Sequence, residues 1–322
     1  MAPHNVTLAR RPRSPVARPI IQVLDVWTVV RLAIVLGITI TTTAGWQWKL
    51  CRGFAFISLM SRRARGGMAA ISAMCAGTRY SAFRTIRDLY ASRIFRDFNL
   101  VSGILRGPRQ RIEFVGLEHL LRALESKHGA VLWMADFVEA GDITKIGLNS
   151  RGLPISHLSR PEHGFGGSRF AIKWLNPIRT RYENRFLAKR IVYDREHPQT
   201  AHACLAAILE RNGIVCITAS QHEGVSLAEA KFLSGRIRLA TGAPRTAYRA
   251  RCPILPIFVL RDRNELLAYS MVFEHPLDLP STVESDKAVM HATADFVERL
   301  ERYVTAYPDL WVGWRRLGLL TK

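Results

Sequence analysis

Three carboxylates follow directly on an apolar run, and their spacing suits proton-transfer chemistry. The stretch WMADFVEAGD, from Trp133 to Asp142, contains Asp136, Glu139 and Asp142. Burial or a like-charged neighbour raises the pKa of a carboxyl group, which makes its carboxylate a better base near neutral pH. We therefore interpret this stretch as the mouth of an active site at the end of a buried strand. It contains no histidine, the side chain whose ordinary pKa of about 6.5 best suits a general base. Two plainer alternatives remain, because Asp142 can cap the following helix and Glu139 can simply be solvated.

A second group of candidate residues follows the apolar segment GIVCITA, residues 213–219. Gln221, His222 and Gly224 lie there. His222 is an alternative proton acceptor to Asp136, with His163 behind it. A lone histidine on a loop is more often exposed than catalytic, so Asp136 is the preferred base.

Several arginines are candidates for binding a phosphate or an acidic carrier, because a guanidinium group grips phosphate bidentately. Arg169 ends a glycine-rich loop, residues 159–169, whose backbone amides are expected to hold a phosphate. A flexible surface loop is the alternative, and the Lys-Ser/Thr ending of a nucleotide P-loop is missing. Arg195 follows a predicted strand, where a salt bridge with Asp194 is the alternative role. The remaining basic candidates are Arg179, Arg181, Arg185, Arg236 and Arg238, the last two at the predicted start of a helix.

Alternating strands and helices have to position these residues. Short apolar runs alternate with helical stretches beyond residue 110, which predicts an α/β fold with a mixed, mostly parallel sheet covered by helices. Functional residues then collect on the loops after the carboxyl ends of the strands. The predicted strands are residues 130–135, 154–158, 190–193, 213–219, 254–260 and 266–273. The predicted helices are residues 116–127, 168–176, 198–212 and 235–251.

The amino-terminal part of the chain predicts a helical, membrane-associated region. Residues 1–20 form a basic, disordered tail, and residues 21–50 an apolar helix that is a possible anchor. The uncharged stretch Leu32–Trp48 is at the lower limit for a membrane-spanning helix, and a buried helix of a soluble domain is the alternative. Residues 51–109 form an amphipathic helical region that either packs on the protein or lies on anionic lipid. Residues 110–322 form the α/β domain.

Composition limits the classes of partner. The net charge of +20 and the isoelectric point of about 10.6 favour polyanions, anionic membranes or acidic substrates. The five cysteines show no pattern of metal ligands or paired disulfides, so we predict small core residues in a reducing compartment, and no metal. A nucleic-acid-binding protein is the alternative from another class, but no helix-turn-helix, RNA-recognition or zinc-finger pattern is present.

The order of the segments resembles the bacterial lipid A biosynthesis (late) acyltransferases. The matching segments are GLEHLLRAL (116–124), AVLWMADF (130–137), RIVYDRE (190–196), NGIVCITASQHEG (212–224), residues 231–261 and YPDLWVGWRR (307–316). The resemblance implies transfer of a fatty acyl chain from a thioester of acyl carrier protein or coenzyme A to a hydroxyl of a glycolipid such as a lipid A precursor. It also implies a place at the cytoplasmic face of the bacterial inner membrane, with membrane lipid and acyl carrier protein as partners. No bound cofactor is implied.

The chain departs from the family's motif of a histidine followed five residues later by Asp or Glu. Asp136 stands at the histidine position and Gly141 at the acid position, with Asp142 one residue further on. Ser220 replaces an aspartate of the later motif, while Gln221 and Gly224 remain. Three interpretations follow. Asp136 replaces the base, another histidine such as His222 supplies it, or the site has lost its activity and the protein binds lipid or protein partners.

Overall fold

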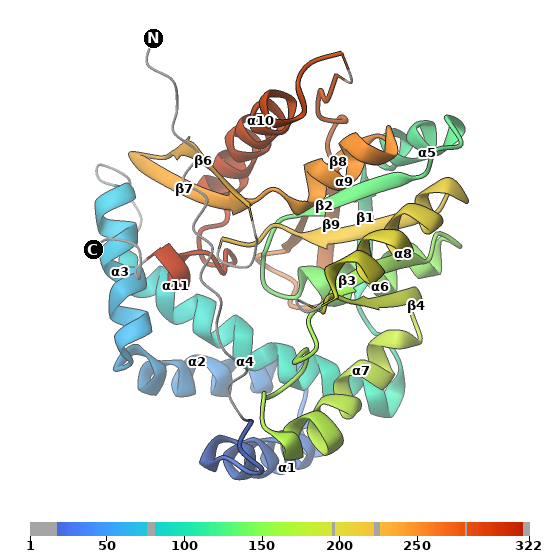
Figure 1. The fold of residues 1–322 in the computed structure, drawn as a ribbon. Coiled ribbons are helices and arrows are strands. Elements are labelled where there is room, and N and C mark those ends of the chain that lie inside the picture. The colour runs from blue at the N-terminus through green and yellow to red at the C-terminus, as the bar shows by residue number, and fades with distance from the viewer. Residues whose placement is uncertain (1–17, 76–80, 195–196, 222–225, 281, 318–322) are drawn as a thin grey trace.

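The computed structural model describes residues 18–75, 81–194, 197–221, 226–280 and 282–317. Most of the predicted tail, residues 1–20, therefore lies outside the described residues. The chain opens with four helices, which lie below and beside the sheet in Figure 1. They are α1 (Val23–Thr41), α2 (Ala44–Leu59), α3 (Arg62–Met74) and α4 (Ala82–Arg106).

The apolar amino-terminal stretch is broken into two helices, so the predicted continuous segment Leu32–Trp48 is wrong. Thr42 and Thr43 have extended backbones, and Thr43 is the N-cap of α2. The hydroxyl of Thr42 donates to the carbonyl of Ile38 at 2.7 Å. A threonine side chain that bonds the preceding turn in this way competes with continuation of the helix.

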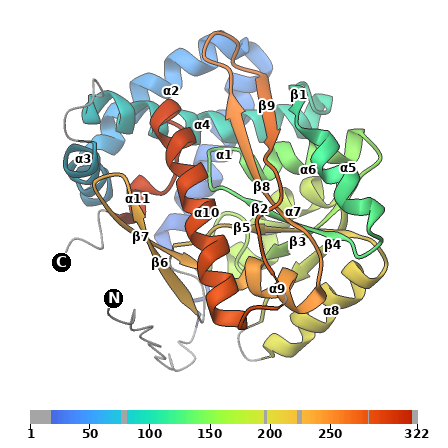
Figure 2. The same cartoon turned by 90° about the horizontal axis from the view of Figure 1, so that it is seen from above.

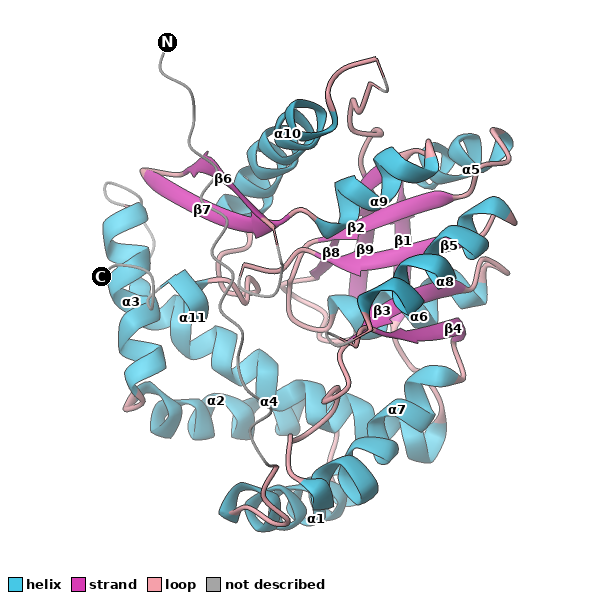
Figure 3. Ribbon diagram, viewed as in Figure 1, coloured by secondary structure: helices cyan, strands magenta, loops and turns pink. Residues whose placement is uncertain are grey.

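A seven-stranded sheet has the order β1-β9-β8-β2-β5-β3-β4. Figure 3 draws its strands in magenta. Every neighbouring pair is parallel except β8 with β9. The predicted α/β class with a mostly parallel sheet is confirmed. The strands are β1 (Arg111–Val115), β2 (Ala130–Met134), β3 (Ile155–Ser159), β4 (Leu187–Val192), β5 (Ile214–Thr218), β8 (Ile254–Arg261) and β9 (Ala268–Phe273).

The remaining elements include a hairpin that the sequence did not predict. Residues 235–251 do not form one helix, because β6 (Leu227–Phe232) pairs antiparallel with β7 (Gly235–Ala240) before a shorter helix begins. Residues 235–240 alternate between buried and more exposed side chains, which is a strand period. The other elements are α5 (Leu117–Glu125), α6 (Ala140–Ser150), the π-helix η1 (Ala171–Leu175), α7 (Asn176–Asn184), α8 (Pro198–Glu210), α9 (Gly242–Ala250), α10 (Ser285–Ala306) and α11 (Trp314–Leu317).

Aromatic side chains join α10 to the centre of the sheet, and Figure 2 shows α10 lying across β2 and β8. The indole of Trp133 on β2 stacks on Phe296 with ring centroids 4.0 Å apart. Phe258 on β8 stacks on Tyr303 at the same centroid distance. Because parallel strands are buried on both faces, these rings form part of the core that holds β2 and β8 against α10.

Replacement of Trp133 tests this core. The side chain is fully buried, and its Nε1–H has no hydrogen-bond partner among the described residues. We expect Trp133→Ala to lower the free energy of unfolding by about 3–5 kcal/mol, because it leaves a cavity. Trp133→Phe should cost much less, since it keeps a stacked ring and removes the unpaired N–H. Urea unfolding of the purified protein measures both, and equal losses would contradict the stacking argument.

Candidate functional site

The carboxyl end of β2 is held against the carboxy-terminal segment of the chain. The amide of Val138 donates to the carbonyl of Leu310 at 2.8 Å, and the amide of Val312 donates to the carbonyl of Asp136 at 3.0 Å. Phe137 and Trp311 form an isolated antiparallel bridge between them. The backbone of Asp136 is therefore fixed by residues almost 180 positions away.

A small cavity joins the tips of β2 and β5. Asp136 and Gln221 line it together, so the structure brings together two residues that the sequence selected. The cavity has a volume of ≈ 10 Å³, about one water molecule. Gln221 is buried, and its Oε1 has no hydrogen-bond partner among the described residues. The other lining residues are Ala135, Ala219, Leu239, Leu300, Trp311 and Gly313.

Guanidinium groups from α4 and the carboxy-terminal segment stand near Asp136. Burial, together with the neighbouring positive charges of Arg315 and Arg96, lowers the pKa of Arg93 to about 9, while Asp136 acts in the opposite direction. Arg315 lies over the ring of Tyr90, one turn before Arg93 on α4. An arginine with this pKa is charged at neutral pH and stabilises the ionised form of a nearby carboxylate.

Glu139 is neither solvated nor open to a substrate, although the sequence offered both roles. It is buried and has a positive φ of 66° at the start of α6. Its carboxyl group accepts hydrogen bonds from Asn99 on α4 at 2.6 Å and from the Tyr269 hydroxyl at 2.7 Å. Burial raises the pKa of Glu139, and Arg261 and the two hydrogen bonds act against it. Glu139 therefore connects α4 and β9 through these two hydrogen bonds.

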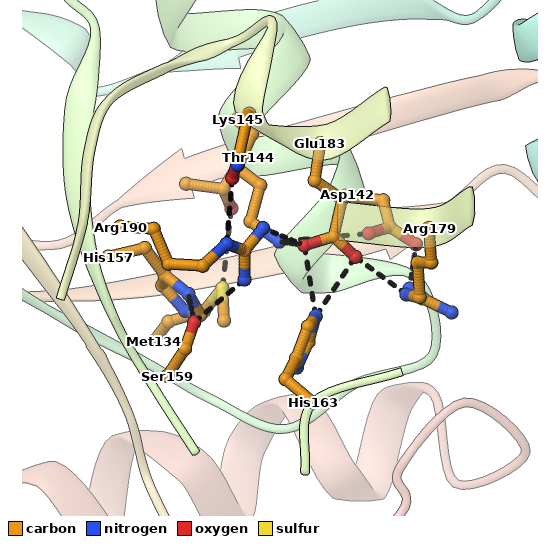
Figure 4. Close-up of polar contacts among 11 residues, drawn as sticks. Met134, Asp142, Thr144, Lys145, His157, Ser159, His163, Arg179, Glu183 and Arg190 are labelled. Atoms are coloured by element: carbon orange, nitrogen blue, oxygen red, sulfur yellow. Dashed lines mark hydrogen bonds and ion pairs between the residues drawn. The ribbon is translucent and has the colours of Figure 1, made fainter. Parts of the chain in front are cut away.

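Asp142 belongs to a buried network of charges between α6 and α7, drawn in Figure 4. Its carboxylate pairs with Arg179 at 2.5 Å, and Lys145 Nζ lies 3.8 Å away. Arg179 also binds Glu183 at 2.6 Å. Asp142 thus forms an ion pair in place of the predicted catalytic or capping role, and Nε and Nη2 of Arg179 already have carboxylate partners.

Glu183 is the centre of this network, a role that no sequence pattern indicated. It lies 2.7 Å from Lys145 and 2.7 Å from Arg190, and the imidazole of His163 lies 2.9 Å from it. Burial acts to raise the pKa of Glu183, but Lys145, His163 and Arg179 outweigh it and hold the pKa well below its usual value. His163, a reserve candidate for the base, is bound here on its Nε2.

The glycine-rich loop is tied to α7. The amides of Phe165 and Gly166 both donate to the side-chain oxygen of Asn176, at 2.7 and 3.1 Å. At Gly164, φ is +142° and a Cβ atom would lie 2.6 Å from Asn176, so only glycine fits. These two amides already have an acceptor, and the amide of Arg169 donates to the carbonyl of Pro19. The expected phosphate site is therefore not formed by these amides.

The other predicted binding residues are separate from the cavity or outside the described residues. Arg236 and Arg238 are not at a helix start, because they lie on β7, where both pair with Glu229. His222, Gly224 and Arg195 fall outside the described residues. Trp311 and Trp314 are buried, and Trp311 is one of the residues that line the cavity.

A larger groove of ≈ 460 Å³ lies elsewhere, between β1 and the carboxyl end of α6. Arg151 is its one titratable lining side chain, and it stacks over Phe114. Since acid–base chemistry needs a group that titrates near neutral pH, the smaller cavity at Asp136 is the better candidate for a catalytic site.

The charge network predicts a specific loss of stability. Glu183→Gln should lower the free energy of unfolding by about 3–5 kcal/mol at pH 7, because it leaves buried cations without their partner. The folded pKa of Glu183 is depressed, so its contribution is complete above the unfolded pKa and is lost as the pH falls through the folded pKa. The difference between parent and variant should therefore shrink in acid. Urea unfolding at pH 7 and at decreasing pH down to about pH 2 measures it.

Glu229→Gln is the matched control, since Glu229 also pairs with two arginines but on an exposed hairpin. We expect less than about 1 kcal/mol there. Equal effects of the two substitutions would show that burial of Glu183 is not what matters.

Comparison with known proteins agrees with this geometry. Residues 105–316 match the family described as bacterial lipid A biosynthesis acyltransferase. Comparison with curated proteins gives no match. The matched range contains the whole seven-stranded sheet, the Asp136 cavity and the charge network. The chain belongs to the bacterial lipid A biosynthesis acyltransferase family.

Proposed function

We propose that the protein transfers a fatty acyl group from a thioester of acyl carrier protein or coenzyme A to a hydroxyl of a membrane glycolipid such as a lipid A precursor. The observation that carries the proposal is the cavity shared by Asp136 and Gln221 at the carboxyl ends of β2 and β5. That edge is where α/β sheets bind ligands, and it is where this family places its reacting groups. The proposed location is the cytoplasmic face of the bacterial inner membrane.

In this mechanism Asp136 accepts the proton of the acceptor hydroxyl. The alkoxide oxygen attacks the thioester carbonyl, the C–S bond breaks, and the carrier leaves as a thiol after protonation. Arg93 is the proposed partner of the oxyanion, because it is cationic at neutral pH and stands near Asp136. It also stabilises the ionised carboxylate, so Asp136 is a weaker base than the family's histidine.

Substrate entry requires movement of the segment that closes the cavity. A volume of ≈ 10 Å³ cannot hold a thioester together with a hydroxyl. Trp311 and Gly313 form one wall, and this wall is attached to the end of β2 by the backbone bonds of Val312 and Val138. We propose that the closing segment separates from β2 when the acceptor lipid binds.

Asp136→Asn tests the proposed base. Acyl transfer to membrane glycolipid from labelled acyl carrier protein should fall by about 10²–10⁴-fold, because the amide cannot accept the proton. Asp142→Asn and His222→Ala are the comparison variants. Asp142→Asn should lose stability more than rate, and His222→Ala should retain activity.

Each other result has a definite meaning. If Asp136→Asn matches an active parent, Asp136 is not the base, and loss with His222→Ala would move that role to His222. A parent that is inert but binds acyl carrier protein or lipid would support the second candidate, a family member without turnover. The closed cavity is the observation that favours this candidate.

The proposed role of Arg93 predicts a loss of rate when its charge is removed. Arg93→Gln should slow acyl transfer by about 10²–10³-fold, the range found for loss of one oxyanion donor. The assay with labelled acyl carrier protein measures this. An Arg93→Gln rate equal to that of the parent would contradict the assignment.

A further inference from the structure

Helix α1 has its polar and apolar faces reversed relative to a helix that meets water. Its buried positions are Asp25, Thr28, Val35 and Thr39, of which one is apolar. Its outward side is almost wholly apolar. The exposed large apolar residues of α1 are Val23, Leu24, Val26, Trp27, Val29, Val30, Ile34, Leu36 and Ile40. A surface helix in water buries its apolar stripe, so this pattern fits an apolar medium outside the protein.

Contacts along the whole length of α1 hold it against the protein. At its start, the amides of Arg169 and Phe170 donate to the carbonyls of Pro19 and Ile20. In its middle, Arg31 pairs at 3.1 Å with Asp97 of α4, whose side chain is 2% exposed. At its end, the Arg106 guanidinium lies 3.4 Å from the Thr39 carbonyl. Figure 3 shows α1 lying along the base of the molecule, beneath α4.

The apolar surface of α1 continues on its neighbours. One stripe of α2, from Gln47 to Leu59, is buried, and much of the rest of that helix is exposed and apolar. Trp174 and Ile178 are exposed on η1 and α7, and the bonds from Arg169 and Phe170 place this segment beside the start of α1. The exposed large apolar residues of α2 are Trp46, Leu50, Phe54, Phe56 and Ile57. Soluble monomers rarely expose contiguous apolar patches larger than about a few hundred Å², so these exposed side chains indicate a surface that contacts something other than water.

Cations accompany the aromatic side chains of this surface. Lys49 lies 4.7 Å from the ring centre of Trp46, and Lys173 lies 5.2 Å from that of Trp174. The side chain of Arg52 is 47% exposed. Tryptophan with lysine or arginine is the combination found where a protein meets lipid headgroups. A protein partner would need no such arrangement, so we identify the occupant as an anionic lipid bilayer.

We infer that α1 and α2 lie flat in the surface of an anionic membrane, with the outer face of α1 in the acyl layer, and that α1 does not cross the membrane. By length and hydropathy, α1 passes as a spanning helix, with a mean hydropathy of 2.1. A spanning orientation would separate Arg31 from Asp97 and would turn Asp25 and two threonines toward hydrocarbon. The flat orientation keeps all of these contacts and immerses the exposed residues.

Depth measurements distinguish the two orientations in the full chain. Spin labels are placed singly at Val23, Val30 and Ile40, with Cys75 and Cys204 replaced by serine. Oxygen and nickel-chelate collision rates are then compared in phosphatidylcholine–phosphatidylglycerol vesicles. A flat helix predicts similar depths for all three labels, about 5–10 Å below the headgroups. A spanning helix places Val23 and Ile40 about 26 Å apart along the membrane normal, with Val30 much deeper than either.

Controls make each outcome decisive. A label at the buried Val35 should show few collisions with either reagent. Asp97→Asn should spread the three depths, because Arg31 loses its partner. Asp88→Asn, which removes the half-buried partner of Arg52, should not. A spanning profile, or labels shielded from lipid and broadened by a second copy of the chain, would overturn the inference.

Vesicle flotation tests the lipid class. Omission of phosphatidylglycerol should weaken binding on the order of 100-fold, for about three surface cations. Equal binding to neutral vesicles would overturn the assignment of an anionic surface. None of these measurements depends on turnover, so failure of the acyl-transfer proposal would leave them unaffected.

Discussion

The turn at Glu139 is the constraint on which the site depends. The chain leaves the central strand β2 and enters α6 through a residue with positive φ, and the side chain of that residue is buried. Asn99 of α4 and Tyr269 of β9 hold its carboxyl group. One residue therefore connects the amino-terminal helices, the central strand and the strand pair at the edge. Asp136 on one side of the turn and Asp142 on the other have different surroundings as a result.

Because of these surroundings, the carboxylates differ in what they contact. Asp142 and Glu183 neutralise Arg179 and Lys145 within a closed network, and charges used in this way cannot easily take part in a reaction. Asp136 lies instead beside a cavity and an arginine from a different element. The resemblance aligns Asp136 with the family's histidine, and Asp136 lines the cavity. It aligns Gly141 with the family's acid, while the neighbouring Asp142 forms an ion pair with Arg179.

Sequence reasoning could find the sheet and the ends of its strands, because strands buried on both faces are continuous apolar runs. Asp136 and Gln221 each follow such a run, and parallel strands bring them to one edge. The roles of Arg93 and Glu183 could not be found in this way. Both lie on helices whose arginine-rich or mixed pattern fits a solvated face equally well, and their partners are far away in the sequence. The hairpin at residues 227–240 was missed because its arginines and glycine also suit the start of a helix.

The loop of residues 159–169 contacts three separate parts of the protein. Asn176 links it to α7, the amide of Arg169 links it to Pro19 just before α1, and His163 links it to Glu183. A shortened chain that starts at α2, designed to improve solubility, would therefore remove more than an exposed apolar helix. It would strip the loop of its anchor and leave Asp97 in the interior without its cation. Handling this protein outside lipid requires an amphiphile that covers α1, not a chain without it.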